Sequence, residues 1–130
     1  MIAVDTSALM SILLSESEGS ACAAILESEP HVLISAGTLA EALIVAARRS
    51  VGEEMAALVE DLAFEIVSVT PAAARGVAAA YERWGKGVHP AGLNFGDCFA
   101  YEAAKEHACP LLYTGNDFAR TDLENALQAR

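Results

Sequence analysis

Short runs of apolar residues alternate along the chain with longer stretches of helical periodicity, and this alternation restricts the fold more than any other feature. The apolar runs lie at residues 2–4, 32–34, 64–69 and 111–113. Strands that are separated by helices need crossover connections, which produce a parallel sheet with helices on both faces. We therefore predict an α/β fold: a three-layer sandwich whose central parallel sheet has four or five short strands flanked by helices.

Several local patterns predict the helices. One amphipathic stripe has apolar residues at the spacing i, i+3, i+4 and i+7, namely Met55, Leu58, Val59 and Leu62. Pro71 suits a first helical position, and Asn94 is a favourable N-cap for a helix over residues 95–107. The Ala-rich, apolar residues 37–49 predict a helix that is mostly buried.

The length and the composition indicate one domain over residues 1–130. The chain has 130 residues, of which 54% are hydrophobic. This is enough to bury one core, too little for two domains, and too apolar for a disordered tail. We find no repeat or linker that divides the sequence.

The chain is strongly acidic, which limits how it can meet nucleic acids. It has 8 Lys and Arg against 18 Asp and Glu, and 8 − 18 gives a net charge of −10. A general nucleic-acid coat needs Lys and Arg to displace the counterions of the phosphates, so we expect no direct contact with DNA. An enzyme that holds phosphates through bound cations remains compatible with this charge.

The cysteine count and the N-terminus predict a cytoplasmic location. The three cysteines, Cys22, Cys98 and Cys109, show no paired spacing, which argues against both a disulfide framework and a zinc site. The sequence MIAVD has no basic segment before an apolar run, so we expect no signal peptide. We also expect no membrane span, since every apolar stretch is far below the ~20 residues that a span requires.

Four acidic residues are predicted to meet at one edge of the sheet. Asp5 directly follows the first strand, and Asp117 lies a few residues past the fourth. Asp97 is in the first turn of the helix that feeds the fourth strand, and Glu41 is early in the helix after the second. Because the carboxyl ends of parallel strands and the starts of the returning helices share an edge, all four should converge there.

A group of four carboxylates at one rim needs a compensating charge, because such groups repel one another and resist burial. A divalent cation with oxygen ligands supplies that charge, and Mg²⁺ fits best, with Mn²⁺ as a substitute. We therefore predict that Asp5, Glu41, Asp97 and Asp117 bind a metal ion.

Three of the acids also have structural explanations. Asp5 could cap the helix that begins at Thr6, Asp97 could form a loose capping box with Asn94, and Asp117 could belong to an Asx-turn. A lone Glu41 among apolar residues has no such explanation. The joint placement of the four favours a metal site more than any single residue does.

At these residues the sequence resembles the PIN-domain ribonucleases, and specifically the VapC-type toxins of type II toxin–antitoxin systems. The matching segments are VDTSAL at residues 4–9, TLAEA at 38–42, LNFGDC at 93–98 and LLYTGNDF at 111–118. The resemblance extends from residue 1 to about residue 125, and implies a single PIN-like domain. It further implies a Mg²⁺-dependent endoribonuclease, usually a homodimer, that a cognate VapB-type antitoxin neutralises. In this family four acids form the metal-binding and catalytic set, so the resemblance implies that role for Asp5, Glu41, Asp97 and Asp117.

The resemblance implies metal-assisted hydrolysis of RNA phosphodiesters by water, with Thr6, Ser7, Thr114 and Asn116 as candidates to orient the acids through hydrogen bonds. The positively charged residues Arg48, Arg49, Lys86 and Arg120 are candidates for an RNA path. The alternative is a non-catalytic PIN-like module that acts only through an antitoxin complex. A phosphatase that forms an aspartyl-phosphate fits poorly, because no acid stands two residues after Asp5.

Overall fold

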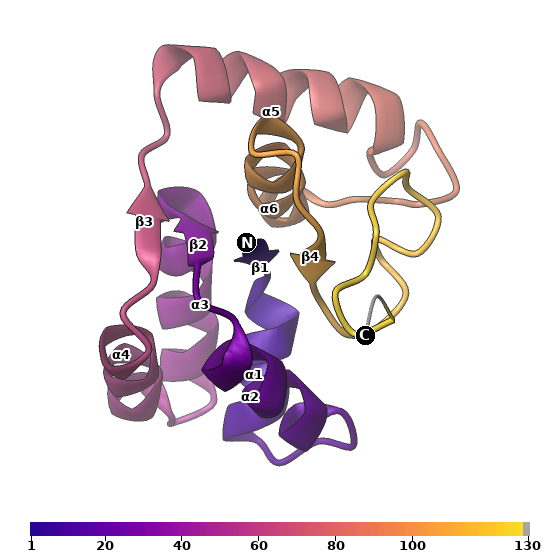
Figure 1. Cartoon of the computed structure of the whole chain (residues 1–130). Helices are drawn as coiled ribbons and strands as arrows, with labels where there is room; N and C mark the ends of the chain where they lie inside the picture. The colour runs from indigo at the N-terminus through magenta and orange to yellow at the C-terminus, as the bar shows by residue number, and fades with distance from the viewer. Residues whose placement is uncertain (129–130) are drawn as a thin grey trace.

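A four-stranded, wholly parallel sheet forms the centre of the protein (Figure 1), as described for residues 1–128 by a computed structural model. The strands are β1 (Ile2–Val4), β2 (Val32–Ser35), β3 (Glu65–Val67) and β4 (Leu111–Leu112), in the spatial order β3-β2-β1-β4. β1, the first strand in sequence, is thus central, and pairs with β2 on one side and with β4 on the other. The predicted parallel sheet is confirmed.

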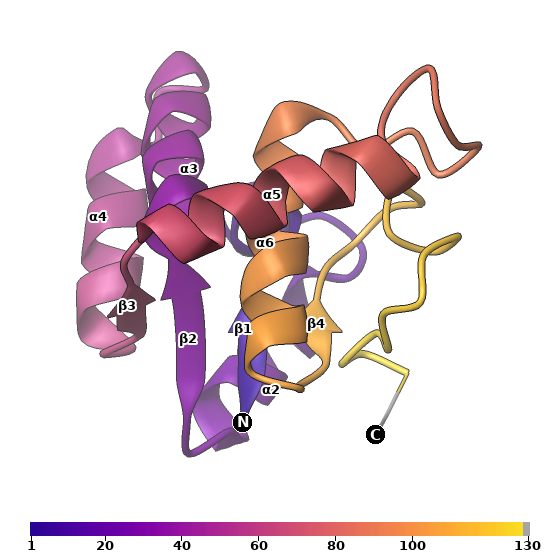
Figure 2. The same ribbon diagram turned by 90° about the horizontal axis from the view of Figure 1, so that it is seen from above.

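Six helices cover the two faces of the sheet. They are α1 (Thr6–Leu13), α2 (Gly19–Ser28), α3 (Ala36–Arg48), α4 (Gly52–Asp61), α5 (Pro71–Trp84) and α6 (Phe95–Glu106). Figure 1 shows α1 to α4 on one face and α5 and α6 on the other, and Figure 2 shows the same arrangement from above. The core is divided accordingly, because successive side chains of a strand point to opposite faces. Val4 packs in the cluster under α1 to α4, whereas Ala3 packs in the cluster under α5 and α6.

Local signals explain where the helices begin. Pro71 is in the first turn of α5, and the Thr70 hydroxyl accepts a hydrogen bond from the Ala73 amide at 3.1 Å. Asn94 caps α6, as predicted. All three cysteines are buried and free. Among the described helices, none has the length and apolar character needed to cross a membrane.

The structure refines one predicted element and contradicts another. The apolar run at residues 64–69 contains a strand, as predicted, but only over Glu65–Val67. This strand, β3, lies at the edge of the sheet, and Ile66 on it is 52% exposed. α3 is not mostly buried: it buries Thr38, Ala42 and Ala46, while Ile44 on the opposite face is 58% exposed. The apolar composition of α3 therefore exceeds what its packing requires.

Candidate active site

Asp5 stands at the end of β1 and caps α1. Its Oδ2 accepts hydrogen bonds from the Ser7 amide at 3.0 Å and from the Ser7 hydroxyl at 2.7 Å. The side chain is buried, and Oδ1 has no hydrogen-bond partner within the described chain. The predicted capping role is therefore real, but it uses only one of the two carboxylate oxygens. An unpaired buried carboxylate oxygen is costly, so capping alone does not explain Asp5.

Asp97 occupies the first turn of α6 and is also buried. Its amide donates to Asn94 Oδ1 at 2.8 Å, and its Oδ2 accepts from the Asn94 amide at 3.0 Å, which forms the reciprocal capping box. This contact orients the carboxylate independently of any ligand. Asp97 therefore combines a helix cap with a buried charge.

Glu41 lies one turn into α3, half-buried against α6. Its Oε1 accepts a hydrogen bond from the Thr6 hydroxyl at 2.7 Å. Gly96 makes room for this carboxylate, because a Cβ atom at Gly96 would overlap Glu41 Oε2. The glycine is thus required by the close approach of α6 to α3. Sequence reasoning did not recognise this role of Gly96, since it depends on two helices more than 50 residues apart.

Asp117 differs from the other three acids in being exposed, in the turn after β4. Phe118 next to it is buried and contacts Tyr113, with 5.2 Å between the ring centroids. The start of this loop is held to α1, because the Thr114 amide donates to the Ser7 hydroxyl at 3.1 Å. A buried neighbour and a cross-link to α1 thus anchor the segment that carries Asp117.

Electrostatic repulsion connects all four acids. Burial raises the pKa of Asp97 from 3.8 to about 7, and the charges of Asp5, Asp117 and Glu41 add to the increase. Burial raises the pKa of Asp5 to about 6, and Glu41 again adds to it. Hydrogen bonds to each carboxylate oppose these increases without cancelling them. The structure therefore places Asp97 within electrostatic range of the other three acids.

The arrangement and the donor atoms of these acids determine whether they could hold a cation. Within residues 1–128, no three His, Cys, Asp or Glu side chains are arranged around a common point to hold a metal ion. Hydrogen bonds from Ser7, Asn94 and Thr6 instead orient Asp5, Asp97 and Glu41. The donor set nevertheless suits a hard cation: it consists of carboxylate oxygens, two of the carboxyls have raised pKa values, and Asp5 Oδ1 lacks a partner.

Two of the four predicted orienting residues bond directly to an acid: Thr6 donates to Glu41, and Ser7 donates to Asp5. Thr114 bonds to Ser7 instead of to an acid. Asn116 is exposed in the loop. Thr38 was not predicted: its hydroxyl is fully buried without a partner in the described chain, one turn before Glu41 on α3.

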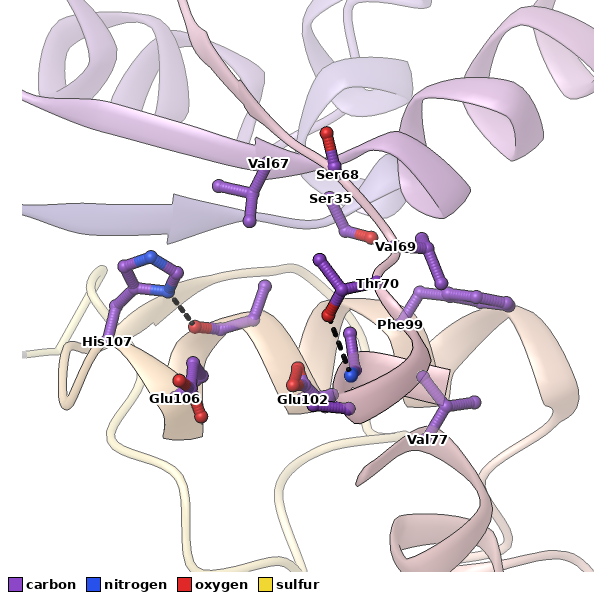
Figure 3. Close-up of a pocket in the computed structure, with 13 residues that line it drawn as sticks. Ser35, Val67, Ser68, Val69, Thr70, Val77, Phe99, Glu102, Glu106 and His107 are labelled. Atoms are coloured by element: carbon purple, nitrogen blue, oxygen red, sulfur yellow. Dashed lines mark hydrogen bonds between the residues drawn. The ribbon is translucent and has the colours of Figure 1, made fainter. Parts of the chain in front are cut away.

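A separate hollow of about 260 Å³ lies between the ends of β2 and β3 and the helices α5 and α6 (Figure 3). Two of its polar side chains have partners within the protein: His107 Nδ1 lies 2.9 Å from the Ala103 carbonyl oxygen, and Thr70 caps α5. The two unpaired buried side-chain atoms of the described chain belong to Asp5 and Thr38, outside this hollow. We therefore place the candidate active site at the four acids.

Comparison with known proteins identifies relatives over nearly the whole chain. The family model for the PIN domain matches residues 2–124. Ribonuclease VapC28 of Mycobacterium tuberculosis is 38% identical over 131 residues, which cover 98% of this chain and 98% of the relative.

Solved structures with similar folds include VapC20 of Mycobacterium tuberculosis, described as a Sarcin-Ricin loop cleaving toxin. It has a TM-score of 0.76 and 18% identity, and the match covers 95% of this chain and 96% of that one. A toxin–antitoxin complex from Klebsiella pneumoniae has a TM-score of 0.69 and 20% identity, covering 94% and 93% of the two chains. At these identities the structures support the fold.

Proposed function

Because this chain belongs to the PIN-domain family and is a VapC-type toxin endoribonuclease, we propose that Asp5, Glu41, Asp97 and Asp117 form its metal-binding catalytic centre. One observation carries the assignment: the buried Asp5 has an unpaired Oδ1 in a group of acids that repel one another. Such an arrangement is costly in the folded protein unless a cation joins it.

Mg²⁺ is the proposed cation, and Mn²⁺ its substitute, since hard divalent ions prefer carboxylate and water oxygens. Asp5 and Asp97 would hold it directly, with Glu41 and Asp117 as further ligands or acting through water. When bound, the ion would offset charge on the phosphate and lower the pKa of water.

The protein itself supplies orientation and proton acceptance. Ser7 and Asn94 fix the carboxylates of Asp5 and Asp97 before any ligand arrives. Thr6 fixes one oxygen of Glu41, and the other faces Gly96. Glu41, or the exposed Asp117, is then placed to accept a proton from the attacking water.

Three partners belong to this proposal. RNA is the substrate, and a VapB-type antitoxin is the inhibitor; the toxin–antitoxin complex from Klebsiella pneumoniae, which has a similar fold, supports such a partner. The chain is proposed to act as a homodimer in the cytoplasm. With a net charge of −10, it is not expected to contact DNA directly.

The test of the proposed function is RNA cleavage by the purified protein. We expect cleavage with Mg²⁺ or Mn²⁺, loss of cleavage with excess chelator, and recovery when the ion is restored. Asp5→Asn, purified in parallel, excludes a contaminating nuclease. A preparation that binds the antitoxin but cuts no RNA with either ion would favour the non-catalytic module instead.

Ser7→Ala is expected to lower metal affinity and cleavage by about 10- to 100-fold, the usual effect of removing a group that orients a metal ligand. The Ser7 hydroxyl donates to Asp5 and accepts from the Thr114 amide, so its loss removes one hydrogen bond from the carboxylate and one from the loop before Asp117. The backbone of residue 7 keeps the other bond to each of them. The Mg²⁺ concentration at half-maximal cleavage measures the effect. Ser28→Ala is the matched control, because its hydroxyl bonds only to the Ile25 carbonyl, on α2. Equal Mg²⁺ midpoints for the two variants would contradict the role of Ser7.

A further inference from the structure

An apolar hollow of about 360 Å³ lies between α3 and α6, directly beside the acids. Glu41 is the only charged residue in its lining, and Ile44 and Val45 of α3 and Phe95 and Phe99 of α6 provide most of its apolar surface. The hollow therefore shares one wall with the proposed catalytic centre. The mechanism proposed above does not use it.

Two phenylalanines give this hollow a fixed shape. The Phe99 ring lies against α3 where Gly37 has no side chain, since a Cβ there would overlap the ring. Phe95 contacts Phe99 edge to face, with 4.9 Å between the centroids and 84° between the planes. The Phe95 side chain is nevertheless 69% exposed, more than any other large apolar side chain in residues 1–128. An aromatic ring that packs against a neighbour on one side and is exposed to solvent on the other can stack with a second planar group.

Phe95 is also close to the acids along the chain. It immediately precedes Gly96, where α6 comes nearest to Glu41, and Asp97 follows. Phe95 and Glu41 line the same hollow, so a ligand group that rests on Phe95 would share that hollow with the Glu41 carboxylate.

Charge decides which ligand suits the hollow. With a net charge of −10, the protein gains little affinity for RNA from its surface as a whole. Stacking of a base on an aromatic ring uses the π-face that every base has, so the ring itself needs no positive charge. A second hollow, lined by Asp117 with Asn116 and Arg120, offers polar and positively charged groups to the phosphates.

We infer that Phe95 is a binding subsite for RNA, on which one unpaired base next to the scissile phosphate stacks. The inference rests on the proposed function and adds a positioning role for a residue that the function did not use. A volume of about 360 Å³ is at the lower end of the range of small-ligand pockets, about 300–1,000 Å³. The hollow also opens where the substrate must approach, beside Glu41.

The test compares cleavage of single-stranded RNA by wild type, Phe95→Leu and Phe95→Trp, each at saturating Mg²⁺. Leu keeps apolar volume but removes the stacking face, and we expect kcat/KM to fall by about 10- to 100-fold, mainly through KM. Trp should retain at least the wild-type value. Tyr81→Leu is the matched control, since Tyr81 is a partly exposed aromatic residue on α5 that does not line the hollow.

A substrate series identifies the base. The series consists of RNA oligonucleotides in which one abasic nucleotide replaces each position around the cut in turn. At one position, the kcat/KM of wild type should fall by about the same factor as the Phe95→Leu substitution causes. Phe95→Leu should lose no more at that position, because the two changes remove the same contact. Additive losses at every position would overturn the inference.

The oligomeric state of wild type and of Phe95→Leu tests whether a second copy of the chain covers the hollow. Light scattering after size-exclusion chromatography measures it. If Phe95→Leu converts a dimer to a monomer and cleavage recovers at high protein concentration, a second copy covers the hollow and the inference is wrong. If wild type cuts no RNA at all, the proposed function fails instead. Equal kcat/KM for wild type and Phe95→Leu, with wild type active, would reject the stacking role alone.

Discussion

Asp5→Asn and Asp97→Asn are each expected to reduce RNA cleavage by about 1,000-fold or more while making the metal-free protein more stable. A bound divalent ion contributes several kcal/mol to the transition state, and about 4 kcal/mol corresponds to 1,000-fold. Removing the charge of a ligand removes that contribution. The metal-free folded state becomes more stable, because each wild-type carboxylate is buried among like charges.

The stability gain follows from the pKa values. An increase in the pKa of Asp5 from 3.8 to about 6 corresponds to a cost of about 3 kcal/mol when the group is ionised. Asparagine removes the charge but stays polar and buried, so we expect a gain of about 1–3 kcal/mol in the free energy of unfolding at pH 7.5.

Denaturant unfolding with chelator present measures stability, and cleavage with Mg²⁺ measures activity. Asp61→Asn is the control, since Asp61 is an exposed acid at the end of α4. It should change neither quantity appreciably. An Asp5→Asn protein that cuts RNA at the wild-type rate would remove Asp5 from the catalytic centre. An Asp5→Asn protein that unfolds more easily than wild type would contradict the free-energy cost assigned to the buried charge of Asp5.

The metal-free protein is expected to lose stability as the pH rises from about 4 to about 7. The pKa values of Asp5 and Asp97 are higher in the folded state than the 3.8 of the unfolded chain. Between these values the folded state binds more protons, so the free energy of unfolding decreases with pH. Each group contributes on the order of 3 kcal/mol, and the loss is complete above the folded pKa values of about 6 and about 7.

Asp122 acts in the opposite direction but in a lower pH range. Burial raises its pKa, yet hydrogen bonds from Tyr101 and Lys105 outweigh burial and leave the pKa below its usual value. The stability that this group contributes is lost only as the pH falls below about 4. It therefore leaves the predicted decrease between pH 4 and 7 intact.

Melting temperatures from pH 4 to 8, with chelator or with Mg²⁺, measure this dependence. Mg²⁺ should stabilise the protein more at pH 7.5 than at pH 5, because protons compete with the ion for the same oxygens. At 100 times its dissociation constant the ion would add ~2.7 kcal/mol. The double variant Asp5→Asn/Asp97→Asn should flatten the profile and remove the Mg²⁺ effect. A metal-free profile that rises between pH 4 and 7 would be inconsistent with these two buried acids.

The arrangement of the strands and the placement of the acids were predictable because both follow from chain connectivity. Once strands and helices alternate, Asp5 must lie at the carboxyl edge, and Asp97 at the start of a returning helix must lie there too. Asn94 was recognised as a cap from sequence spacing alone, and the structure has the reciprocal contact.

The features that escaped prediction depend on contacts between helices distant in sequence. Gly96 looks like a poor helix residue until Glu41 is seen against it. The exposure of Ile44 on α3 could not be predicted. An apolar helix has the same sequence pattern whether or not another element covers its second face. Hydrogen-bond details such as the unpaired Asp5 Oδ1 require coordinates.

The link between Ser7 and Thr114 joins residues 107 positions apart, and β4 pairs with β1 beside it. During translation β1 therefore pairs with β4 only after residues 111–112 have been synthesised, and Asp117 follows in the same late segment. On the proposed function, nascent chains and fragments that stop before residue 117 would lack one of the four acids, and we expect them not to cleave RNA.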